Sequence, residues 1–395
     1  MSEARAQFVG IEEAIEEIRL GRIVIIVDDE DRENEGDLTV AAEKVTPEHI
    51  NFMSTHGRGL VCVTLTAERC DYLRLRQMSD ENTSPYSTAF CESIDARFGV
   101  STGISAADRA ATIRLAIDPA ARPTDLVRPG HVFPLRARPG GVLVRAGQTE
   151  ASVDLARLAG LAPSGVICEV MNEDGTMARV PDLAAFCARH DLKMITVADL
   201  IRYRLRTESI VRRVGEALLP TRHGDFHMIA YESEINGEQH VALVKGNFSA
   251  EDAVLVRMHA HCLAGDVFGS RRCDCQQVID KSLELIGAAG RGVLVYLHQT
   301  GPGFSIEKVE DKSVISVHHH DHGRERDAAE ADAQQHNIQR ESGIGAQILR
   351  DLGVRNVRLL TNHPRKIPGL EGFGIRILDA VPVPAGTHGL VRRDA

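Results

Sequence analysis

A run of ten residues, Asp28–Asp37, concentrates acidic side chains directly after an apolar stretch. It reads Asp-Asp-Glu-Asp-Arg-Glu-Asn-Glu-Gly-Asp and holds seven carboxylates and one arginine. In an extended loop Glu33, Glu35 and Asp37 would point to the same side, an arrangement suited to Mg²⁺, which prefers oxygen ligands. A calcium EF-hand does not fit, because Ala42 stands where the last Glu of that loop belongs. We predict metal or substrate binding here; the alternative is a solvated acidic turn.

Three of the eight cysteines, Cys262, Cys273 and Cys275, gather in one short polar segment. Zinc takes four ligands in structural sites and three plus water in catalytic ones, so three thiolates predict a zinc centre. A nearby imidazole, from His259 or His261, would close the shell, whereas a bound water would leave the fourth position open. The scattered cysteines are interpreted as small buried apolar side chains: Cys62, Cys70, Cys91, Cys168 and Cys187.

Other polar side chains stand beside glycines or at a strand end, in residues 128–131, 145–150 and 168–169. Arg145, Gly147 and Thr149 supply a cation, a close backbone approach and a hydroxyl, which together can hold a phosphate at the start of a helix. His131 and Glu169, each taken alone, are as readily structural. The residues by themselves predict a metal-dependent enzyme acting on a small phosphorylated substrate.

Helical and strand patterns alternate around these residues in the first half. Residues 11–18 have helical spacing and residues 23–27 form a β-branched run that leads into the acidic segment. Ser105 begins a capping box before a helix that ends at Ile117. Further strands are predicted at 60–65 and 165–170, and further helices at 181–190 and 196–206. The mixture indicates an α/β (α+β) class, with an N-terminal mixed α/β sandwich.

A charged connection at residues 206–216 marks the predicted domain boundary, which gives domains 1–207 and 208–395. Two strand-like runs, 225–234 and 239–245, are joined by Asn236-Gly237, a strong hairpin signal, and we expect this hairpin to begin the C-terminal α+β, zinc-containing domain. The His-rich residues 310–340 show little periodicity and are predicted to form a mobile or irregular loop.

Composition supports this organisation. At about 100–200 residues per domain, 395 residues favour two domains. Hydrophobic residues at 43% and charged residues at 26% are ordinary for a globular chain, and 46 basic against 56 acidic side chains give a net charge of −10. That balance argues against nucleic acid or an anionic membrane as the main partner. The sequence lacks a membrane-length apolar run and a signal-like N-terminus, so we expect a cytoplasmic protein.

Four segments together resemble 3,4-dihydroxy-2-butanone 4-phosphate synthase of riboflavin biosynthesis: Asp28–Asp37, Gly103–Arg109, Arg128–Leu135 and Asn172–Arg179. The resemblance covers nearly all of residues 8–206. It implies a lyase that converts ribulose 5-phosphate to the four-carbon phosphate and formate with Mg²⁺ (or Mn²⁺), and a homodimer. Such chemistry needs proton abstraction next to a carbonyl, and a metal bridging the sugar oxygens stabilises the enediolate.

The resemblance also implies roles for individual residues. Glu33 resembles the metal-ligating Glu, and His131 and Glu169 the residues essential for turnover. Where the family commonly has a metal-binding His, this chain has Gln148, whose carbonyl oxygen is an acceptable Mg²⁺ ligand, so activity should survive. The implied substrate contacts are Arg32, Glu33, Asp37, Thr102 and the phosphate-side loop Arg145, Ala146, Gly147, Gln148 and Thr149. Asp37 and Cys62 are also implied catalytic residues, and Cys62 and Thr102 fall on segments that line the family's site.

Three later segments, Val256–Cys275, Gly343–Leu349 and Leu359–Pro364, resemble GTP cyclohydrolase II over about residues 216–385. The resemblance implies that the three cysteines bind Zn²⁺ and that GTP or another nucleotide is the ligand. By position, Arg257 is a triphosphate contact, Arg340 the catalytic arginine, and Thr361 and Lys366 nucleotide contacts.

Several functional positions of that family are nevertheless changed here. His261 replaces the Glu before the first zinc cysteine, Val278 replaces a Gln, and residues 299–305 lack the acid and the arginine that meet the nucleotide. Ile338 stands where a proton-accepting Asp is expected, and an apolar residue cannot take a proton. We therefore expect GTP hydrolysis to be lost. The alternatives are a true bifunctional enzyme, and a zinc-stabilised regulatory or dimerisation module.

Overall fold

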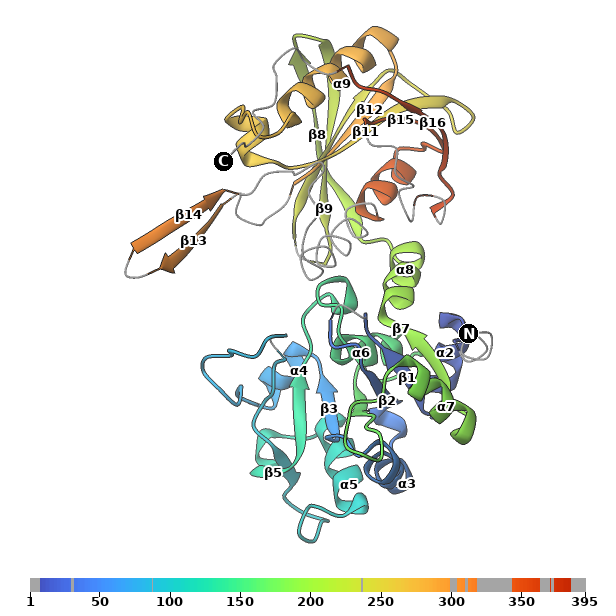
Figure 1. Cartoon of the computed structure of the whole chain (residues 1–395), viewed down its shortest axis with the longest axis vertical. Helices are drawn as coiled ribbons and strands as arrows, with labels where there is room; N and C mark the ends of the chain where they lie inside the picture. The colour runs from blue at the N-terminus through green and yellow to red at the C-terminus, as the bar shows by residue number, and fades with distance from the viewer. Residues whose placement is uncertain are drawn as a thin grey trace. The chain divides into compact units, whose positions relative to one another are not determined.

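The chain forms two compact units, Met1–Arg204 and Leu205–Ala395, shown in Figure 1. The computed structural model describes residues 8–29, 32–86, 88–235, 237–298, 304–309, 312–317, 343–362, 370 and 373–384. The predicted site residues Arg340 and Lys366 lie outside these ranges, as do Asn236, Ile338 and the histidines of residues 318–322.

The first unit is built on a mixed seven-stranded sheet with the order β4-β5-β3-β6-β2-β1-β7. Neighbouring strands run antiparallel except for the parallel pairs β3/β5 and β1/β7. The strands are β1 (Val24–Val27), β2 (Gly36–Ala41), β3 (Cys62–Leu65), β4 (Ile94–Ala96), β5 (Leu126–Arg136), β6 (Gly165–Glu169) and β7 (Lys193–Thr196).

Helices pack on both faces of this sheet. On one face Ile25, Leu38 and Val166 join a buried cluster with Ile113 of α5 and Leu183 of α7. On the other face α6 lies over β2, β3 and β6. The predicted sandwich is therefore confirmed. The helices are α2 (Ile11–Arg19), α3 (Pro47–Phe52), α4 (Ala67–Tyr72), α5 (Ala106–Ile117), α6 (Gln148–Leu158), α7 (Val180–His190) and α8 (Val197–Thr207), with short turns at η1 (Ala42–Lys44), η2 (Met53–Gly57), η3 (Pro123–Asp125) and η4 (Gly141–Leu143).

The capping box predicted at the start of α5 is half correct. The Ser105 hydroxyl accepts the Asp108 backbone N–H at 3.1 Å, as an N-cap should. The Asp108 carboxylate, however, accepts from the Ser101 hydroxyl at 2.7 Å and from the Gly103 N–H at 3.1 Å. The Asp108 carboxylate thus holds the loop before α5, whereas in a complete capping box it would accept the backbone N–H of the N-cap residue Ser105.

The second unit contains another mixed seven-stranded sheet, ordered β16-β15-β11-β12-β10-β9-β8, and a separate β13-β14 hairpin. Helix α9 packs on this sheet through Val278 and Ile286, which meet Phe226 and Leu294 in the core. The unit is α+β, as predicted. Its elements are β8 (Val211–Thr221), β9 (Gly224–Ser233), β10 (Gln239–Lys245), β11 (Ala253–Ala260), η5 (Leu263–Val267), α9 (Cys275–Ala289), β12 (Gly292–Leu297), β13 (Phe304–Val309), β14 (Lys312–Val317), a helix over residues 343–351, β15 (Asn356–Leu360) and β16 (Arg376–Val381).

Two predictions in this unit were wrong. Residues 206–216 are not only a charged connection, because β8 begins at Val211 and pairs with β9 along its length. Side chains 212–218 of this edge strand are exposed, so the apolar alternation that signals a strand is missing. The sheet therefore starts before the predicted hairpin. Residues 312–317, assigned to an irregular loop, form β14.

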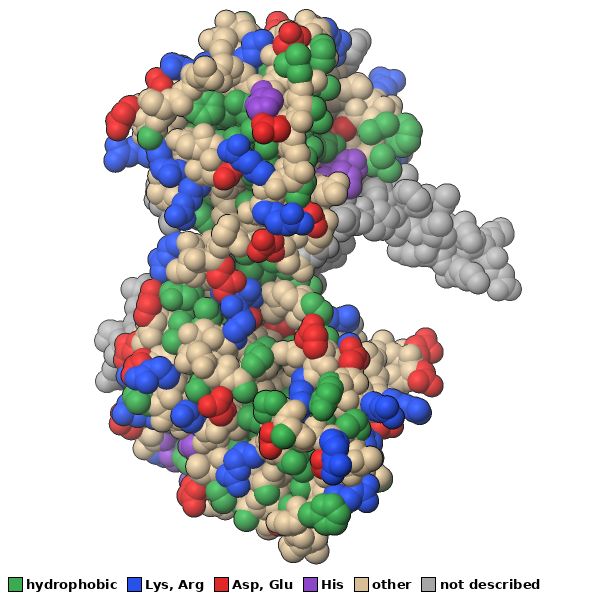
Figure 2. All heavy atoms as spheres, turned by 180° about the vertical axis from the view of Figure 1, so that it is seen from behind, with side chains coloured by type: hydrophobic (Ala, Val, Ile, Leu, Met, Phe, Trp, Pro, Cys, Tyr) green, Lys and Arg blue, Asp and Glu red, His purple; other side chains and the backbone are tan. Residues whose placement is uncertain are grey.

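Charged side chains of both signs lie on the surface (Figure 2). Acidic and basic side chains are interspersed on the face shown in Figure 2, without a broad field of one sign. Among the described residues, none of the helices combines the length and apolarity that a membrane span requires. All eight cysteines are buried, which confirms the interpretation of the five scattered ones.

Candidate active site and zinc centre

The acidic segment connects β1 to β2 and is organised by one carboxylate, that of Asp28. It accepts the backbone N–H groups of Glu33 at 3.1 Å and Glu35 at 2.9 Å, and it pairs with Arg32 Nη1 at 2.7 Å. The loop is not extended, because Asn34 has a left-handed φ of 53°. The expectation of three acids on one side of an extended chain was therefore wrong; a turn places Glu33, and strand pairing places Asp37.

Arg32 connects the acidic loop to the start of α6. Its Nη1 donates to the Gln148 side-chain oxygen at 3.1 Å, and its Nη2 lies 2.7 Å from Glu33 Oε1. The Tyr86 hydroxyl donates to the Arg32 carbonyl at 2.6 Å, and the guanidinium lies 5.1 Å from the Tyr86 ring centre. The two residues predicted to bind metal, Glu33 and Gln148, are thus brought to the same guanidinium.

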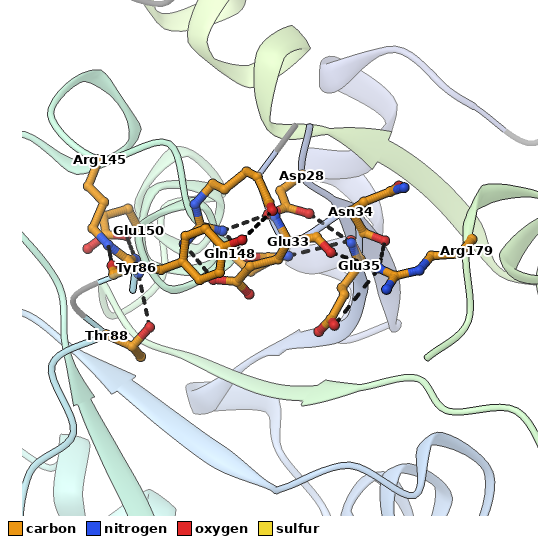
Figure 3. A network of polar contacts seen from close by, with 11 residues as sticks. Asp28, Glu33, Asn34, Glu35, Tyr86, Thr88, Arg145, Gln148, Glu150 and Arg179 are labelled. Atoms are coloured by element: carbon orange, nitrogen blue, oxygen red, sulfur yellow. Dashed lines mark hydrogen bonds and ion pairs between the residues drawn. The ribbon is translucent and has the colours of Figure 1, made fainter. Parts of the chain in front are cut away.

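Arg145 is held at the other side of this network (Figure 3). Its guanidinium pairs with Glu150 at 2.7 Å and donates to Thr88 Oγ1 and the Tyr86 carbonyl, each at 3.1 Å. Gly147 is the N-cap of α6, and a Cβ there would lie 2.5 Å from Arg145 Nη1. The predicted phosphate-side loop therefore combines a fixed cation with the open backbone N–H groups of a helix start.

Strand pairing places two acids side by side, since Asp37 of β2 is opposite Glu169 of β6. Burial raises the pKa of the Asp37 carboxyl well above its usual range, and the charges of Glu169 and Glu33 raise it further. Burial also raises the pKa of Glu33, although the charge of Arg32 opposes this shift. Glu169 itself accepts the Leu60 backbone N–H at 2.8 Å. The acids of β2, β6 and the loop before β2 therefore repel one another, as the raised pKa values of Asp37 and Glu33 indicate.

Cys62 lies on the same face of the sheet, opposite Ile167 of β6. Burial raises the pKa of its thiol well above the usual range, and the charges of Glu169 and Asp37 act in the same direction. The side chain is 2% exposed. Cys62 therefore lines the site as a neutral thiol and not as a thiolate nucleophile.

His131 projects from β5, and its Nδ1 lies 2.7 Å from Asp95 Oδ2. Gly103, the neighbour of Thr102, approaches this pair closely, since a Cβ there would lie 2.7 Å from His131 Nδ1. The structure thus brings the Thr102 loop and His131 together. Asp95 and Tyr86 were not among the predicted site residues, because only contacts distant along the chain, to His131 and to Arg32, identify them.

The first unit offers carboxylate and amide oxygens, which are the ligand atoms that a hard divalent cation prefers. Asp37, Glu33 and Glu35 all have raised carboxyl pKa values, because they are buried among other acids. A bound divalent cation would offset that repulsion. In the described part of the chain these carboxylates do not form a set of three ligand atoms within 4.8 Å. Glu33 and Gln148 are joined through Arg32, which contacts both.

Cys262, Cys273 and Cys275 form the predicted cluster, with all three sulfurs within 4.8 Å of one another. Cys262 follows β11, and Cys275 begins α9. A Cβ on Gly265 would lie 2.5 Å from Cys273 Sγ and 3.1 Å from Cys262 Sγ, so glycine is needed for the sulfurs to meet. The Asp266 carboxylate accepts the Cys262 N–H at 2.8 Å and fixes the turn. The donor set and its cradle fit zinc.

Neither candidate histidine joins the three sulfurs in this structure. His259 Nε2 lies 3.0 Å from Asp266 Oδ1 and shares a second group of possible ligands with Asp266 and Cys275. His261 Nδ1 lies 2.6 Å from the Tyr296 hydroxyl, which itself donates to Asp266. Closure of the shell by a histidine and a water in the fourth position therefore both stay predictions.

Two predicted nucleotide contacts lie next to each other in the second unit. Arg257 of β11 donates to the Leu360 carbonyl at 3.0 Å, directly before Thr361. Its Nε is buried without a hydrogen-bond partner among the described residues, and burial lowers the pKa of the guanidinium. The predicted catalytic Arg340 and the predicted nucleotide contact Lys366 lie outside the described residues.

Comparison with known proteins agrees with this division of the chain. The profile of the 3,4-dihydroxy-2-butanone 4-phosphate synthase family matches residues 12–203, and that of the GTP cyclohydrolase II family matches residues 212–382. Riboflavin biosynthesis protein RibBA of Aquifex aeolicus is 57% identical over 386 residues, covering 95% of this chain and 93% of that protein. RibBA of Salinispora tropica is 50% identical and covers 96% and 94%.

A solved structure is similar over the whole chain. The crystal structure of RibBX, described as a two domain 3,4-dihydroxy-2-butanone 4-phosphate synthase from A. baumannii, has a TM-score of 0.75 and 42% sequence identity, and covers 96% of this chain and 100% of its own. With two domain profiles in order and relatives similar along the full length, the chain belongs to the RibBA family of riboflavin biosynthesis proteins, in which a 3,4-dihydroxy-2-butanone 4-phosphate synthase domain precedes a GTP cyclohydrolase II domain.

Proposed function

We propose that residues 1–207 convert D-ribulose 5-phosphate to 3,4-dihydroxy-2-butanone 4-phosphate and formate. The observation that carries this proposal is the convergence on Arg32 of the acidic loop and the start of α6, beside the facing acids Asp37 and Glu169. This arrangement unites acids that can move protons with a phosphate-binding helix start. The membership in a synthase-containing family agrees with it.

Each group has a defined part in this proposal. Arg145 and the backbone N–H groups of Gln148 and Thr149, at the start of α6, bind the substrate phosphate, which has the charge that a helix N-terminus favours. Arg32 orients a substrate oxygen. Burial and neighbouring charges raise the pKa of Asp37 well above its usual range, so its carboxyl keeps a proton to a higher pH than a free carboxyl does. His131 and Glu169 exchange protons with the sugar carbons and hydroxyls.

Glu33 and Gln148 would hold the divalent cation, Mg²⁺ or Mn²⁺. When bound, the cation supplies positive charge where negative charge develops on the sugar oxygens during proton abstraction. Arg32 already bridges these two side chains, so substrate and cation would share one set of contacts. The buried carboxylates around them supply the complementary negative field.

The direct test is product analysis of the purified full chain with ribulose 5-phosphate and Mg²⁺. We expect release of one formate per four-carbon phosphate formed, and loss of the activity when EDTA is present in excess. An untreated chain that leaves ribulose 5-phosphate unchanged in the presence of Mg²⁺ or Mn²⁺ would contradict the proposal.

For residues 208–395 we propose a domain that keeps zinc on Cys262, Cys273 and Cys275 but does not hydrolyse GTP. Support comes from Ile338 in place of a proton acceptor and from the changed residues 299–305. The similar A. baumannii protein is described as a two domain 3,4-dihydroxy-2-butanone 4-phosphate synthase. The family profile over 212–382 and the RibBA relatives favour the bifunctional alternative, which therefore has to be tested.

GTP offered to the full chain separates these possibilities. We expect no formamidopyrimidine product and no GTP consumption under conditions in which ribulose 5-phosphate is converted. Steady GTP consumption that disappears in Cys273→Ser would establish the bifunctional enzyme instead.

Light scattering on the same preparation tests the proposed homodimer, which should have about twice the mass of the 43.1 kDa chain.

A further inference from the structure

His131 lies in a bulge of β5 that the neighbouring strand β4 does not follow. In the β4–β5 ladder Ile94 is opposite Val132, but the next residue, Asp95, is opposite Val127. Residues 128–131 are thus looped out of the ladder between two paired positions. A bulge of this kind redirects a side chain that a regular strand would place in the sheet face. What directs the His131 ring in this bulge is Asp95.

Asp95 holds His131 through both carboxylate oxygens. Its Oδ1 accepts the His131 backbone N–H at 3.0 Å, and its Oδ2 lies 2.7 Å from His131 Nδ1. The Asp95 side chain is 9% exposed, whereas the His131 side chain is 42% exposed. The carboxylate therefore lies at the buried Nδ1 edge of the ring, and the rest of the imidazole extends toward solvent.

This contact determines which ring nitrogen carries the proton in the neutral imidazole. An ionised carboxylate can only accept hydrogen bonds, so Nδ1 must be the donor and Nε2 is left with its lone pair. We propose that Asp95 is a positioning residue for the lyase reaction: it fixes the ring of His131 and its tautomer, so that Nε2 can take a proton from the substrate and return it. This inference rests on the proposed function of the first unit.

A second loop closes over the pair and requires glycine. Gly103 has a φ of +92°, and a Cβ there would lie 2.2 Å from Asp95 Oδ2 and 2.7 Å from His131 Nδ1. Asp108 fastens this loop through the Gly103 N–H at 3.1 Å and the Ser101 hydroxyl at 2.7 Å. The loop leaves little freedom to either partner of the pair, and it places Thr102, a predicted substrate contact, next to them.

The competing explanation is that Asp95 serves only to hold the bulge through the His131 backbone N–H. Asp95→Asn separates the two roles. An asparagine can keep its oxygen on the backbone N–H, but its NH₂ group would then face Nδ1 and favour the tautomer with the proton on Nε2. The bulge would survive while the basic nitrogen would be on the wrong side of the ring.

The experiment compares the full-length wild type with Asp95→Asn in steady-state formate release. We expect kcat to fall by about 10²–10⁴-fold with KM within about threefold, as is typical when the acid behind a catalytic histidine is replaced by its amide. The matched control is Asp71→Asn, because Asp71 is an exposed acid that pairs with Arg136 on the same strand β5. It should keep kcat within about twofold. A kcat of Asp95→Asn within threefold of wild type would overturn the proposal.

The tautomer can be measured without relying on activity. In ¹⁵N-histidine NMR spectra of the full chain, the His131 signal, assigned by its absence in His131→Gln, should show a protonated Nδ1 in the wild type. Asp95→Asn should move the proton to Nε2. Protonation at Nε2 in the wild type would overturn the proposal even if Asp95→Asn failed to fold. A wild type inactive on ribulose 5-phosphate would contradict the proposed function, whereas the spectrum would still decide the His131 tautomer.

Discussion

The carboxylates of Asp28 and Asp37 differ in what surrounds them. Asp28 accepts two backbone N–H groups and the guanidinium of Arg32, so its charge is balanced by donors. Asp37, at the other end of the same loop, lies beside Glu169 and among further acids, and its pKa is raised. One acid therefore builds the loop, and the other is available for proton transfer or for charge pairing with a ligand.

Glu33 is the residue whose loss should affect the cation most. Glu33→Gln keeps the size of the side chain but removes a charged oxygen ligand, so formate release should fall at least about 10²-fold while the fold persists. Formate assays over a range of Mg²⁺ concentrations check this. Glu16→Gln is the control, since Glu16 only pairs with Arg19 on the exposed side of α2. Near wild-type turnover of Glu33→Gln in excess Mg²⁺ would remove the metal role.

Gln148→His should be tolerated. It restores an imidazole at a position where the synthase family commonly has one, and a neutral imidazole can accept the Arg32 N–H that Gln148 now accepts at 3.1 Å. We expect kcat within about fivefold of wild type and half-activation at a lower concentration of Mn²⁺ or Mg²⁺. Complete loss of activity would mean that Gln148 belongs to a differently built site.

The raised pKa of Asp37 also predicts that the stability of the fold depends on pH. Its folded-state pKa lies above the value of about 3.9 in an unfolded chain, so the folded protein binds this proton more tightly. The resulting contribution to stability is present below the unfolded pKa and is lost as the pH rises through the folded value. Asp37→Asn, which cannot ionise, should avoid this loss.

Melting temperatures in Mg²⁺-free buffer between pH 5 and pH 8.5 provide the measurement. Relative to wild type, Asp37→Asn should gain stability as the pH rises, by at least about 2 °C, which corresponds to about 1 kcal/mol for a unit of this size. Parallel curves for the two proteins would show that Asp37 ionises as freely in the folded chain as in the unfolded one.

At the scale of elements, the end of β6 and the turn after η2 approach each other very closely. A Cβ on Gly59 would lie 2.5 Å from the Glu169 carbonyl oxygen and 2.7 Å from its backbone nitrogen. Gly59→Ala should therefore displace Glu169, lowering the melting temperature by several degrees and formate release by at least about tenfold. Gly215→Ala, where nothing lies within 4 Å, should change neither. Full activity of Gly59→Ala would show that the position of Glu169 is not critical.

How far the sequence could predict these elements depended on burial. Helix α2 is amphipathic and strand β1 is fully buried. The spacing of apolar residues in the sequence therefore predicted both elements closely. Strand β8 is an exposed edge strand and lacks that pattern. The acidic run and the three cysteines were recognisable because their ligands are close in sequence. Asp95 was not, because its partner His131 is 36 residues away and is reached only through an irregular strand pairing.

At the scale of the whole molecule, zinc should stabilise the second unit without serving the first. Cys273→Ser removes one of the three sulfurs, so the second unit should lose the proposed zinc and should melt at a lower temperature. Formate release should stay within about twofold of wild type. Metal analysis and calorimetry provide the measurements, and Arg272→Ser, an exposed neighbour, is the control. If Cys273→Ser abolished formate release, the two units would not be functionally separate.

The contact between Arg32 and Gln148 joins residues 116 positions apart, and β2 lies between β1 and β6 although β6 is made much later. During synthesis the acidic loop therefore leaves the ribosome long before α6 and β6 exist to complete its surroundings. Contacts this distant form slowly, since a long loop must close before any of them contributes. A chain halted before Gln148 would expose the acids of the loop without the helix that anchors Arg32. The acidic loop is thus translated before the elements that complete its surroundings, and it reaches its final form only after α6 and β6 have been made.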